Sequence, residues 1–344
     1  MKLLVTGGAG FIGSNFIRLM LTRRKDVEIV NLDKLTYAGN PENLSDIAEQ
    51  PGYSFVHGDI ADSALVGKKL AEGFDAVVNF AAETHVDRSI EDAAPFLRTN
   101  ILGTHALLEA ARRVKLPLFV HISTDEVYGS AKPGQSFDES APLDPHSPYS
   151  ASKAAADHLV MAYSNTYKLP ALILRCTNNN GPYQFPEKLI PLMVANAREN
   201  KPLPVYGDGL QERDWIYVED YCRAIERVLE AGRPGEIYNV AAGAPTPNLK
   251  VVQTILQLLG KPESLIRHVE DRPGHDRRYA INCVKIQGEL GWQPEISFEE
   301  GIRRTIAWYE SNSEWLAHTR SGEYRQYYDR HYTRRGETFG GVIR

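Results

Sequence analysis

The sequence has few residues of the kinds that build disulfide frameworks or metal sites. Its three cysteines, Cys176, Cys222 and Cys283, lie far apart and include no C-x-x-C pair. The ten histidines show no H-E-x-x-H or similar ligand spacing. This pattern argues against disulfides and zinc, so we expect a metal-free protein in a reducing compartment, the cytoplasm.

Long apolar runs and an excess of positive charge are also missing. No apolar stretch approaches the roughly 20 residues that a helix needs to cross a bilayer. The opening residues MKLLVTGGAG read directly into a strand and a turn, without the pattern of a signal peptide. A net charge of −5 provides no basic field, so neither a membrane nor nucleic acid is an expected partner.

The first half of the chain alternates short apolar runs with longer helical patterns. The runs are nearly continuous and rich in β-branched residues, as in parallel strands that helices cover on both faces. The pattern predicts an α/β fold of the Rossmann type, with a doubly wound parallel sheet. The expected strands are KLLVTG at 2–7, VEIVNLD at 27–33, YSFVHGDI at 53–60, DAVVNFAA at 75–82 and LPLFVHIST at 116–124, with helices at 11–24 and 94–114.

The rhythm changes after residue 176. A helical pattern opened by Pro186 is followed by short apolar segments and loops rich in Pro, Gly and charge. We therefore expect residues 1–176 to form mainly a dinucleotide-binding domain and 177–330 mainly a smaller mixed α/β substrate-binding region. Segments such as 214–243 are expected to return to the first domain, and 331–344 to form a tail.

A glycine-rich turn follows the first strand and opens the first helix. In TGGAGFIG, Gly7, Gly10 and Gly13 allow a tight turn, close approach of a pyrophosphate and close packing of helix on strand. Asp33 ends the second strand, where a carboxylate accepts bonds from ribose hydroxyls and repels a 2′-phosphate. This favours NAD over NADP, although Lys34 argues mildly the other way. A strand-end aspartate that only caps a turn is the alternative.

A Tyr-x-x-x-Lys pair opens a later helical pattern. Tyr149 and Lys153 in PYSASKAAADHL lie four residues apart and therefore on one helix face. A phenol has a pKa of about 10, and a neighbouring ammonium or a cationic cofactor favours its phenolate. The pair is common in ordinary helices, but here it follows a dinucleotide-type turn and a strand that ends in Thr124. With these motifs the chain resembles the extended short-chain dehydrogenases/reductases.

Two adjacent acids, Asp125 and Glu126, follow that strand in HISTDEVYGS. They could be solvated residues of a strand end, or an acid and a base at one reacting centre. The order of STDEVYG, AAETHVDRS, NNNGPYQFPEKLIP, GDGLQERDWIYVED and DRPGHDRRY favours the second reading. Together these motifs resemble the dTDP-glucose 4,6-dehydratase family from residue 1 to about residue 316. One position departs from the family pattern N-N-Y-G-P, where this chain has Asn180; it leaves the packing of that loop in question.

The resemblance implies a three-part reaction. Tyr149 takes the proton of the sugar 4-hydroxyl while hydride passes from C4 to NAD, with Lys153 lowering the tyrosine pKa and holding the ribose. Thr124 hydrogen-bonds the reacting oxygen. Glu126 then removes the C5 proton, and a protonated Asp125 delivers a proton to the departing 6-hydroxyl. Hydride returns to C6 and gives a 4-keto-6-deoxy sugar.

The resemblance also implies the residues that bind each ligand. Arg213 and Arg272 are expected to hold the diphosphate, a task that suits the guanidinium fork, and Pro204 to Tyr206 to flank the base. The NAD contacts implied are Gly7, Gly10, Phe11, Ile12, Gly13, Asp33, Lys34, Leu35, Thr36, Asp59, Ile60, Ala81, Ala82, Thr84, Thr99, Tyr149, Lys153, Cys176 and Asn179. The nucleotide-sugar contacts implied are His85, Thr124, Asn178, Lys188, Leu189, Pro204, Val205, Tyr206, Arg213, Asn248, Arg272 and His275.

Several functions remain open at this point. A 4-epimerase or a UDP-glucuronate decarboxylase also uses a Tyr/Lys pair with NAD, but neither needs an acid to expel a 6-hydroxyl. A UDP-glucose 4,6-dehydratase differs from the dTDP enzyme by one methyl group on the base. A non-enzymatic NAD-binding regulator has no need of the whole catalytic set. A homodimer through the helical patterns at 94–114 and 147–167 is what the family implies.

Overall fold

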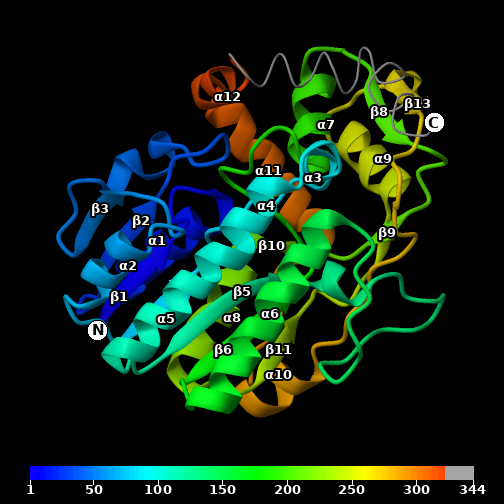
Figure 1. The fold of residues 1–344 in the computed structure, drawn as a ribbon. Helices are drawn as coiled ribbons and strands as arrows, with labels where there is room; N and C mark the ends of the chain where they lie inside the picture. Colours follow the sequence, from blue (N-terminus) through cyan, green and yellow to red (C-terminus); the bar gives the residue numbers. More distant parts are fainter. Residues whose placement is uncertain (322–344) are drawn as a thin grey trace.

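A seven-stranded parallel sheet forms the centre of the molecule (Figure 1). The computed structural model describes residues 1–321, and within them the sheet has the order β11-β6-β5-β4-β1-β2-β3. All six neighbouring pairs are parallel, which confirms the predicted fold class. The strands are β1 (Lys2–Thr6), β2 (Glu28–Asp33), β3 (Tyr53–His57), β4 (Ala76–Asn79), β5 (Phe119–Thr124), β6 (Ala171–Cys176) and β11 (Ile237–Val240).

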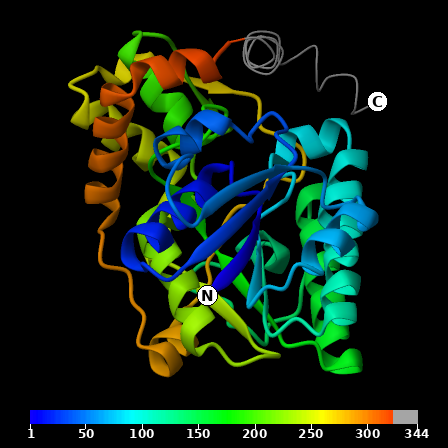
Figure 2. The ribbon, with the colours of Figure 1, turned by 90° about the vertical axis from the view of Figure 1, so that its left-hand side faces the viewer.

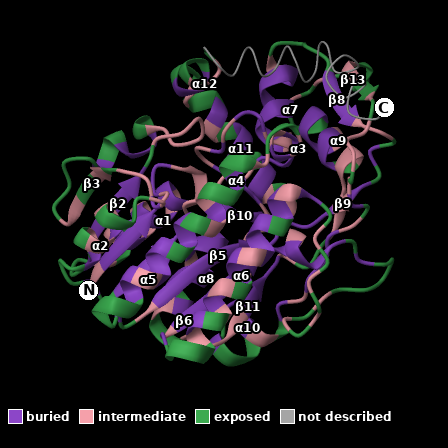
Figure 3. Cartoon of the chain, viewed as in Figure 1, coloured by how far each residue is buried: buried purple, intermediate pink, exposed green. Residues whose placement is uncertain are grey.

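Successive residues of each strand enter two different apolar cores. Leu3 and Val5 pack with α1 and α8 on one face, while Leu4 between them packs with α2, α5 and α6 on the other. Figure 2 shows α5 and α6, in cyan and green, on one side of the sheet and the yellow-green α8 on the other. Figure 3 shows the inner strands buried, whereas the edge strand β3 is partly exposed. The covering helices are α1 (Phe11–Arg23), α2 (Ser63–Leu70), α5 (Thr104–Val114), α6 (Pro148–Tyr167) and α8 (Val218–Ala231).

The strand order reverses between β1 and β4. From β1 the chain runs through β2 and β3 toward one edge, and from β4 it runs through β5 and β6 toward the other. Ligands of doubly wound sheets bind at such a switch point, outside the carboxyl ends of the strands. We therefore expect the ligand site among the segments that follow β1, β4 and β5.

The expected helix at 94–114 is not regular. It consists of α4 (Ala94–Phe96), a π-helical stretch over Leu97–Gly103, and α5. Within the wide turn, the side-chain amide of Asn100 exchanges hydrogen bonds with the backbone of Glu83 and donates to Ser152 Oγ at 2.8 Å. These bonds tie the loop after β4 to α6, and π-helical turns often mark such functional positions.

A second region lies at the carboxyl edge of the sheet and has its own apolar core. Its strands pair as β7 with β10, β8 with β13, and β9 with β12. The expected helix opened by Pro186 begins only at Leu189, because Lys188 is still extended and forms its N-cap. The helices of the region are α7 (Leu189–Arg198), α9 (Asn248–Leu258), α11 (Phe298–Ser311) and α12 (Ser313–Thr319). The strands are β7 (Asn178–Asn180), β8 (Leu203–Tyr206), β9 (Glu212–Arg213), β10 (Trp215–Tyr217), β12 (Thr246–Pro247) and β13 (Ile266–Val269).

The chain crosses between the two regions more than once. After β10 it forms α8 and β11, and β11 pairs with β6 of the central sheet. Two further helices are α3 (Val86–Glu91), which follows β4, and α10 (Val284–Leu290), which follows β13. The division into domains remains a prediction, and the tail at 331–344 lies outside the described residues. No helix within residues 1–321 has both the length and the apolar character that crossing a membrane requires.

Candidate active site

A cavity opens at the switch point of the sheet, and we call it the first cavity. Gly7 has φ of +71°, and a Cβ there would lie 2.6 Å from the backbone nitrogen of Ala81. A Cβ on Gly13 would lie 2.5 Å from the carbonyl oxygen of Gly7. The first cavity is lined by these predicted cofactor residues: Gly7, Gly10, Phe11, Ile12, Gly13, Asp33, Lys34, Thr36, Asp59, Ile60, Ala81, Ala82, Thr84, Thr99, Tyr149, Lys153, Cys176 and Asn179.

Leu35 is the one predicted cofactor residue that is not among the lining residues of the first cavity. Its backbone N–H instead donates to Asp33 Oδ1 at 2.8 Å, and the N–H of Ala9 donates to Asp33 Oδ2 at 2.9 Å. Asp33 therefore caps a turn and also lines the first cavity, and its contact with a ribose stays a prediction. Lys34, which argued for NADP, forms an ion pair with Asp59 at 2.9 Å.

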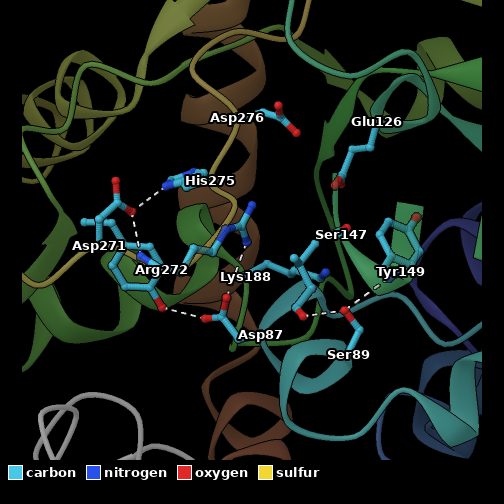
Figure 4. Close-up of polar contacts among 12 residues, drawn as sticks. Asp87, Ser89, Glu126, Ser147, Tyr149, Lys188, Asp271, Arg272, His275 and Asp276 are labelled. Carbon is cyan, nitrogen blue, oxygen red and sulfur yellow. Dashed lines mark hydrogen bonds and ion pairs between the residues drawn. The ribbon is translucent and has the colours of Figure 1, made fainter. Parts of the chain in front are cut away.

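The predicted catalytic residues come from two elements that meet over this cavity. Thr124 ends β5, and Asp125 and Glu126 begin a short 3-10 helix over Asp125–Tyr128. Tyr149 lies in the first turn of α6, which begins with Pro148 after a capping box formed by Ser147. The backbone N–H of Tyr149 donates to Ser89 Oγ at 3.2 Å (Figure 4). The first turn of α6 is therefore fixed both by the Ser147 cap and by Ser89 of α3.

The Thr124 hydroxyl connects the phenol to one of the acids. It donates to Asp125 Oδ1 at 3.3 Å and also hydrogen-bonds the Tyr149 side chain. Asp125 is only 3% exposed, and its Oδ2 has no hydrogen-bond partner within the described residues. A carboxyl in this position is suited to exchange a proton with Thr124 on one side and with a ligand on the other.

Burial gives the two acids unusual pKa values. The pKa of Asp125 lies well above its ordinary value because the carboxyl is buried and because the Glu126 charge is adjacent. Burial also raises the pKa of Glu126, but the guanidinium groups of Arg272 and Arg213 oppose that shift. The neighbourhood therefore favours a protonated Asp125 beside an ionised Glu126, which is the division that an acid and a base require.

The ammonium of Lys153 hydrogen-bonds groups other than Tyr149, and its predicted effect on the tyrosine pKa stays a prediction. Its ammonium donates to the backbone oxygen of Ile122 at 2.6 Å and lies 3.4 Å from His121 Nε2. Burial lowers the pKa of Lys153 to about 8, and burial followed by the Glu126 charge raises the pKa of Tyr149 well above its usual range. The hydrogen bond from Thr124 opposes that rise in the pKa of Tyr149.

A second cavity adjoins the first and shares Glu126, Asn178, Glu187 and Lys188 with it. It is lined by the other predicted nucleotide-sugar residues, while Thr124 lines the first cavity. In Figure 4, Glu126 and Tyr149 lie on one side of this site, and Asp271, Arg272 and His275 on the other. The predicted residues of the second cavity are His85, Asn178, Lys188, Leu189, Pro204, Val205, Tyr206, Arg213, Asn248, Arg272 and His275.

Several of these side chains are held by partners that the sequence did not reveal. Asp87 lies 3.4 Å from Arg272 Nη1 and accepts a bond of 2.7 Å from the Tyr206 hydroxyl. Asp271 Oδ1 lies 2.6 Å from His275 Nδ1. The AAETHVDRS and DRPGHD motifs contain both aspartates, but their pairing depends on how the second region folds over the sheet.

Arg213 is positioned by another unpredicted residue, Tyr279. The guanidinium lies 4.0 Å from the ring centroid of Tyr279 and donates to the backbone oxygens of Glu212 and Asp276.

Other lining residues that the sequence analysis missed include Glu83, Glu187, Gln184 and Phe185 of the first cavity. Glu187 belongs to the FPEKLIP motif, and that motif was the sequence signal from which it could have been predicted.

Asn180 fits its buried position through hydrogen bonds. Its amide Nδ2 donates to the backbone oxygen of Ile216 at 3.3 Å, and its Oδ1 accepts a bond of 3.1 Å from Thr305. The side chain is fully buried, and a Cβ on Gly301 would lie 3.1 Å from its Oδ1. Both ends of the amide are thus satisfied, which resolves the packing question that the sequence raised.

Known proteins that are similar to this chain indicate its family. The family model for GDP-mannose 4,6 dehydratase matches residues 4–305. A dTDP-glucose 4,6-dehydratase of Xanthomonas campestris pv. campestris is 52% identical, over 94% of this chain and 97% of the relative. The chain belongs to the dTDP-glucose 4,6-dehydratase family.

Solved structures of this superfamily share the architecture. DesIV, a dTDP-glucose 4,6-dehydratase from Streptomyces venezuelae solved with NAD bound, superimposes with a TM-score of 0.90 at 49% identity, covering 93% of this chain and all of that one. A UDP-glucose 4-epimerase from Thermus thermophilus, in complex with NAD, gives 0.84 at 32% identity over 91% of this chain and 100% of that one. The fold alone therefore does not separate dehydratases from epimerases.

The first cavity of this family member has the features that a dinucleotide needs. Cβ atoms on Gly7 and Gly13 would fill the turn, so their absence leaves room for a pyrophosphate beside the start of α1. Asp33 offers carboxylate oxygens at the end of β2, where a ribose is expected. Within residues 1–321, no group of three His, Cys, Asp or Glu side chains is arranged to hold a metal ion.

Proposed function

We propose that the protein is an NAD-dependent dTDP-glucose 4,6-dehydratase, a hydro-lyase that produces dTDP-4-keto-6-deoxyglucose. The observation that carries this proposal is the position of Asp125 and Glu126. The two acids stand beside Thr124 and Tyr149 in the first cavity, and Glu126 also lines the second. An acid, a base and a phenol therefore meet where a cofactor site joins a nucleotide-sugar site.

The reaction begins at the 4-hydroxyl of the glucose. Oxidation at C4 makes the C5 proton acidic, because it then lies α to a ketone. Bound NAD accepts the C4 hydride and later supplies the hydride that C6 receives. Tyr149 takes the hydroxyl proton as its phenolate. Burial raises the pKa of Tyr149, and a nearby positive charge would favour the phenolate.

Elimination uses the two acids in different protonation states. Glu126 removes the C5 proton, and Asp125 gives its proton to the departing 6-hydroxyl, which leaves as water. The raised pKa of Asp125, caused by burial and by the Glu126 charge, keeps that carboxyl protonated for this step. Arg272 and Arg213 oppose the rise in the pKa of Glu126, so the base remains available.

The protons balance only if two groups are reset in each turnover. Glu126 takes one proton from C5 and returns one to it, whereas Tyr149 gains a proton and Asp125 loses one. The Thr124 hydroxyl hydrogen-bonds both Tyr149 and Asp125. Thr124 can therefore pass its proton to Asp125 while it accepts the proton of Tyr149, which restores both groups.

The pair of acids also separates this proposal from its rivals. A 4-epimerase performs no chemistry at C5 or C6, and a UDP-glucuronate decarboxylase expels no hydroxyl group. A non-enzymatic regulator gives no reason for the buried carboxyl of Asp125 to face the phenol site. Preference for thymidine over uridine is proposed from the relatives, since one methyl group in an apolar pocket is worth only about 1–3 kcal/mol.

We further propose a cytoplasmic homodimer. Four large apolar side chains on the helices that the family implies for dimerisation are exposed: Leu97 at 48%, Leu102 at 60%, Val114 at 38% and Tyr167 at 52%. All three cysteines are free and buried, as expected in a reducing compartment. Sedimentation should give the mass of a dimer, and Leu102→Glu should shift it toward the monomer.

An isotope experiment tests the reaction itself. With dTDP-glucose that carries deuterium at C4, the label should appear on the C6 methyl group of the same product molecule, as read by mass spectrometry and NMR. Loss of the label to solvent would contradict the proposal. Recovery of the label at C4 of an epimerised sugar would instead support the epimerase.

A further inference from the structure

A chain of polar side chains leads from Glu126 to the surface, away from the other catalytic groups. The hydroxyl of Tyr279 lies 3.5 Å from Glu126 Oε2 and donates to Asp276 Oδ2 at 2.7 Å. Asp276 Oδ1 lies 2.6 Å from His146 Nδ1. The side chain of His146 is 42% exposed, whereas Tyr279 and Asp276 are buried, with only 3% and 5% of their surface exposed.

The two acids of the site, Asp125 and Glu126, differ in their connection to solvent. Asp125 is buried, and it accepts a hydrogen bond from Thr124, which in turn hydrogen-bonds Tyr149. Glu126 also faces the second cavity, so a nucleotide sugar bound there would cover that route to solvent. Tyr279 also lines the second cavity, but from its hydroxyl the hydrogen-bonded chain continues through the buried carboxyl of Asp276 to His146.

The surroundings of His146, at the exposed end of this chain of side chains, favour proton exchange with solvent. The imidazole of His146 lies between two carboxylates, Asp276 at 2.6 Å from Nδ1 and Asp144 at 3.4 Å from Nε2. The hydrogen bond to Asp276 raises the pKa of His146 above its ordinary value. The imidazole of His146 is therefore a group that can take up and release a proton in contact with water.

We propose that Tyr279, Asp276 and His146 form a proton relay that connects Glu126 with solvent while substrate occupies the site. This inference rests on the proposed dehydratase reaction, in which Glu126 holds the C5 proton between elimination and its return. The relay lets Glu126 exchange that proton before C5 is protonated again. The hydrogen found at C5 of the product then comes from solvent.

Each transfer in the relay is balanced. As Glu126 gives its proton to the oxygen of Tyr279, the phenol gives its own proton to Asp276 Oδ2. The carboxyl of Asp276 turns about its Cβ–Cγ bond and hands the proton to Nδ1 of a neutral His146, whose Nε2 releases a proton to water. The reverse sequence brings a solvent proton to Glu126, and no electrons are transferred.

The test measures the origin of the C5 hydrogen in a single turnover. Unlabelled dTDP-glucose is mixed with excess enzyme in D2O, the reaction is quenched early, and the product is analysed by NMR and mass spectrometry. The wild-type protein should place deuterium at C5 in most product molecules. His146→Ala and Tyr279→Phe should reduce this fraction at least about fivefold, with retention of the substrate's own C5 hydrogen.

The variants are chosen so that the outcomes are distinct. Tyr279→Phe keeps the ring beneath Arg213 and removes only the hydroxyl, and His146→Ala changes an exposed side chain. His158→Ala, at an exposed position on α6, is the matched control and should leave the deuterium fraction unchanged. Equal deuterium at C5 in all four proteins would overturn the relay. Failure of every protein to form the keto sugar would instead overturn the proposed function.

Discussion

The two cavities of this protein are built in different ways. The first lies against regular elements: a glycine turn between β1 and α1, the ends of β2, β4 and β5, and the first turns of α6. The second depends on side chains that long loops bring together, with Arg272 against Asp87 and His275 against Asp271.

The difference explains which contacts can be recognised in a sequence. A dinucleotide is bound largely by backbone groups and small residues, so their order within a strand, turn and helix is itself the signal. A nucleotide sugar is bound by charged side chains, and each needs a partner to hold it in position. Those partners are distant in sequence, as Asp87 and Arg272 are, which are 185 positions apart.

The largest effect should come from the acids at the junction of the cavities. Asp125→Asn and Glu126→Gln should lower the rate of product formation by about 10²–10⁴-fold, the usual contribution of general acid or base catalysis. Hydride removal from C4 should persist, and rapid-scan absorbance of the reduced cofactor would report it. Asp138→Asn, on an exposed loop, is the control. Normal product formation by both variants would mean that the acids have no such roles.

The second cavity should respond through substrate affinity. Arg272→Ala removes a buried guanidinium and leaves Asp87 without that partner, so kcat/KM should fall by about 10²-fold, since breaking such a pair costs about 2–5 kcal/mol. Most of the change should appear in KM. Arg272→Lys retains the charge without the fork and should recover part of the loss. An unchanged KM in Arg272→Ala would separate this arginine from substrate binding.

The first cavity should respond through cofactor affinity. Gly7→Ala adds a methyl group at φ of +71° and 2.6 Å from Ala81, and the left-handed backbone alone costs about 1–2 kcal/mol for a residue with a side chain. Titration calorimetry should show NAD binding weakened by about tenfold or more, where 1.4 kcal/mol is one factor of ten. Gly67→Ala is the matched control, because a Cβ there meets nothing within 4 Å. It should bind NAD normally and be slightly more stable.

The smallest effect is expected away from both cavities. Thr305→Val removes the donor to Asn180 Oδ1 and leaves a buried acceptor unpaired, which should lower the free energy of unfolding by about 1–3 kcal/mol. Chemical denaturation would measure this change, and kcat should stay at the wild-type value. A loss of activity at unchanged stability would show that the loop at Asn180 takes part in catalysis.

The sequence analysis was most successful where chemistry follows local order. The parallel sheet, the glycine turn and the placement of Asp125 and Glu126 after β5 all depend on residues close together in the chain. It was less successful for interactions across the fold. The orientation of Lys153 toward Ile122 and the late start of α7 depend on neighbours that no local pattern contains.

The residue order by itself determined the strand–helix alternation, the dinucleotide turn and the presence of an acid pair beside a Tyr/Lys helix. Period-two and period-3.6 patterns, glycine and capping residues act over a few positions, so the sequence alone carries them. Only the tertiary structure decided that the two acids have different surroundings, Asp125 sealed behind Thr124 and Glu126 connected through Tyr279 and Asp276 to His146. Burial and electrostatic interaction depend on distance in space, and that distance is set when the second region folds over the sheet.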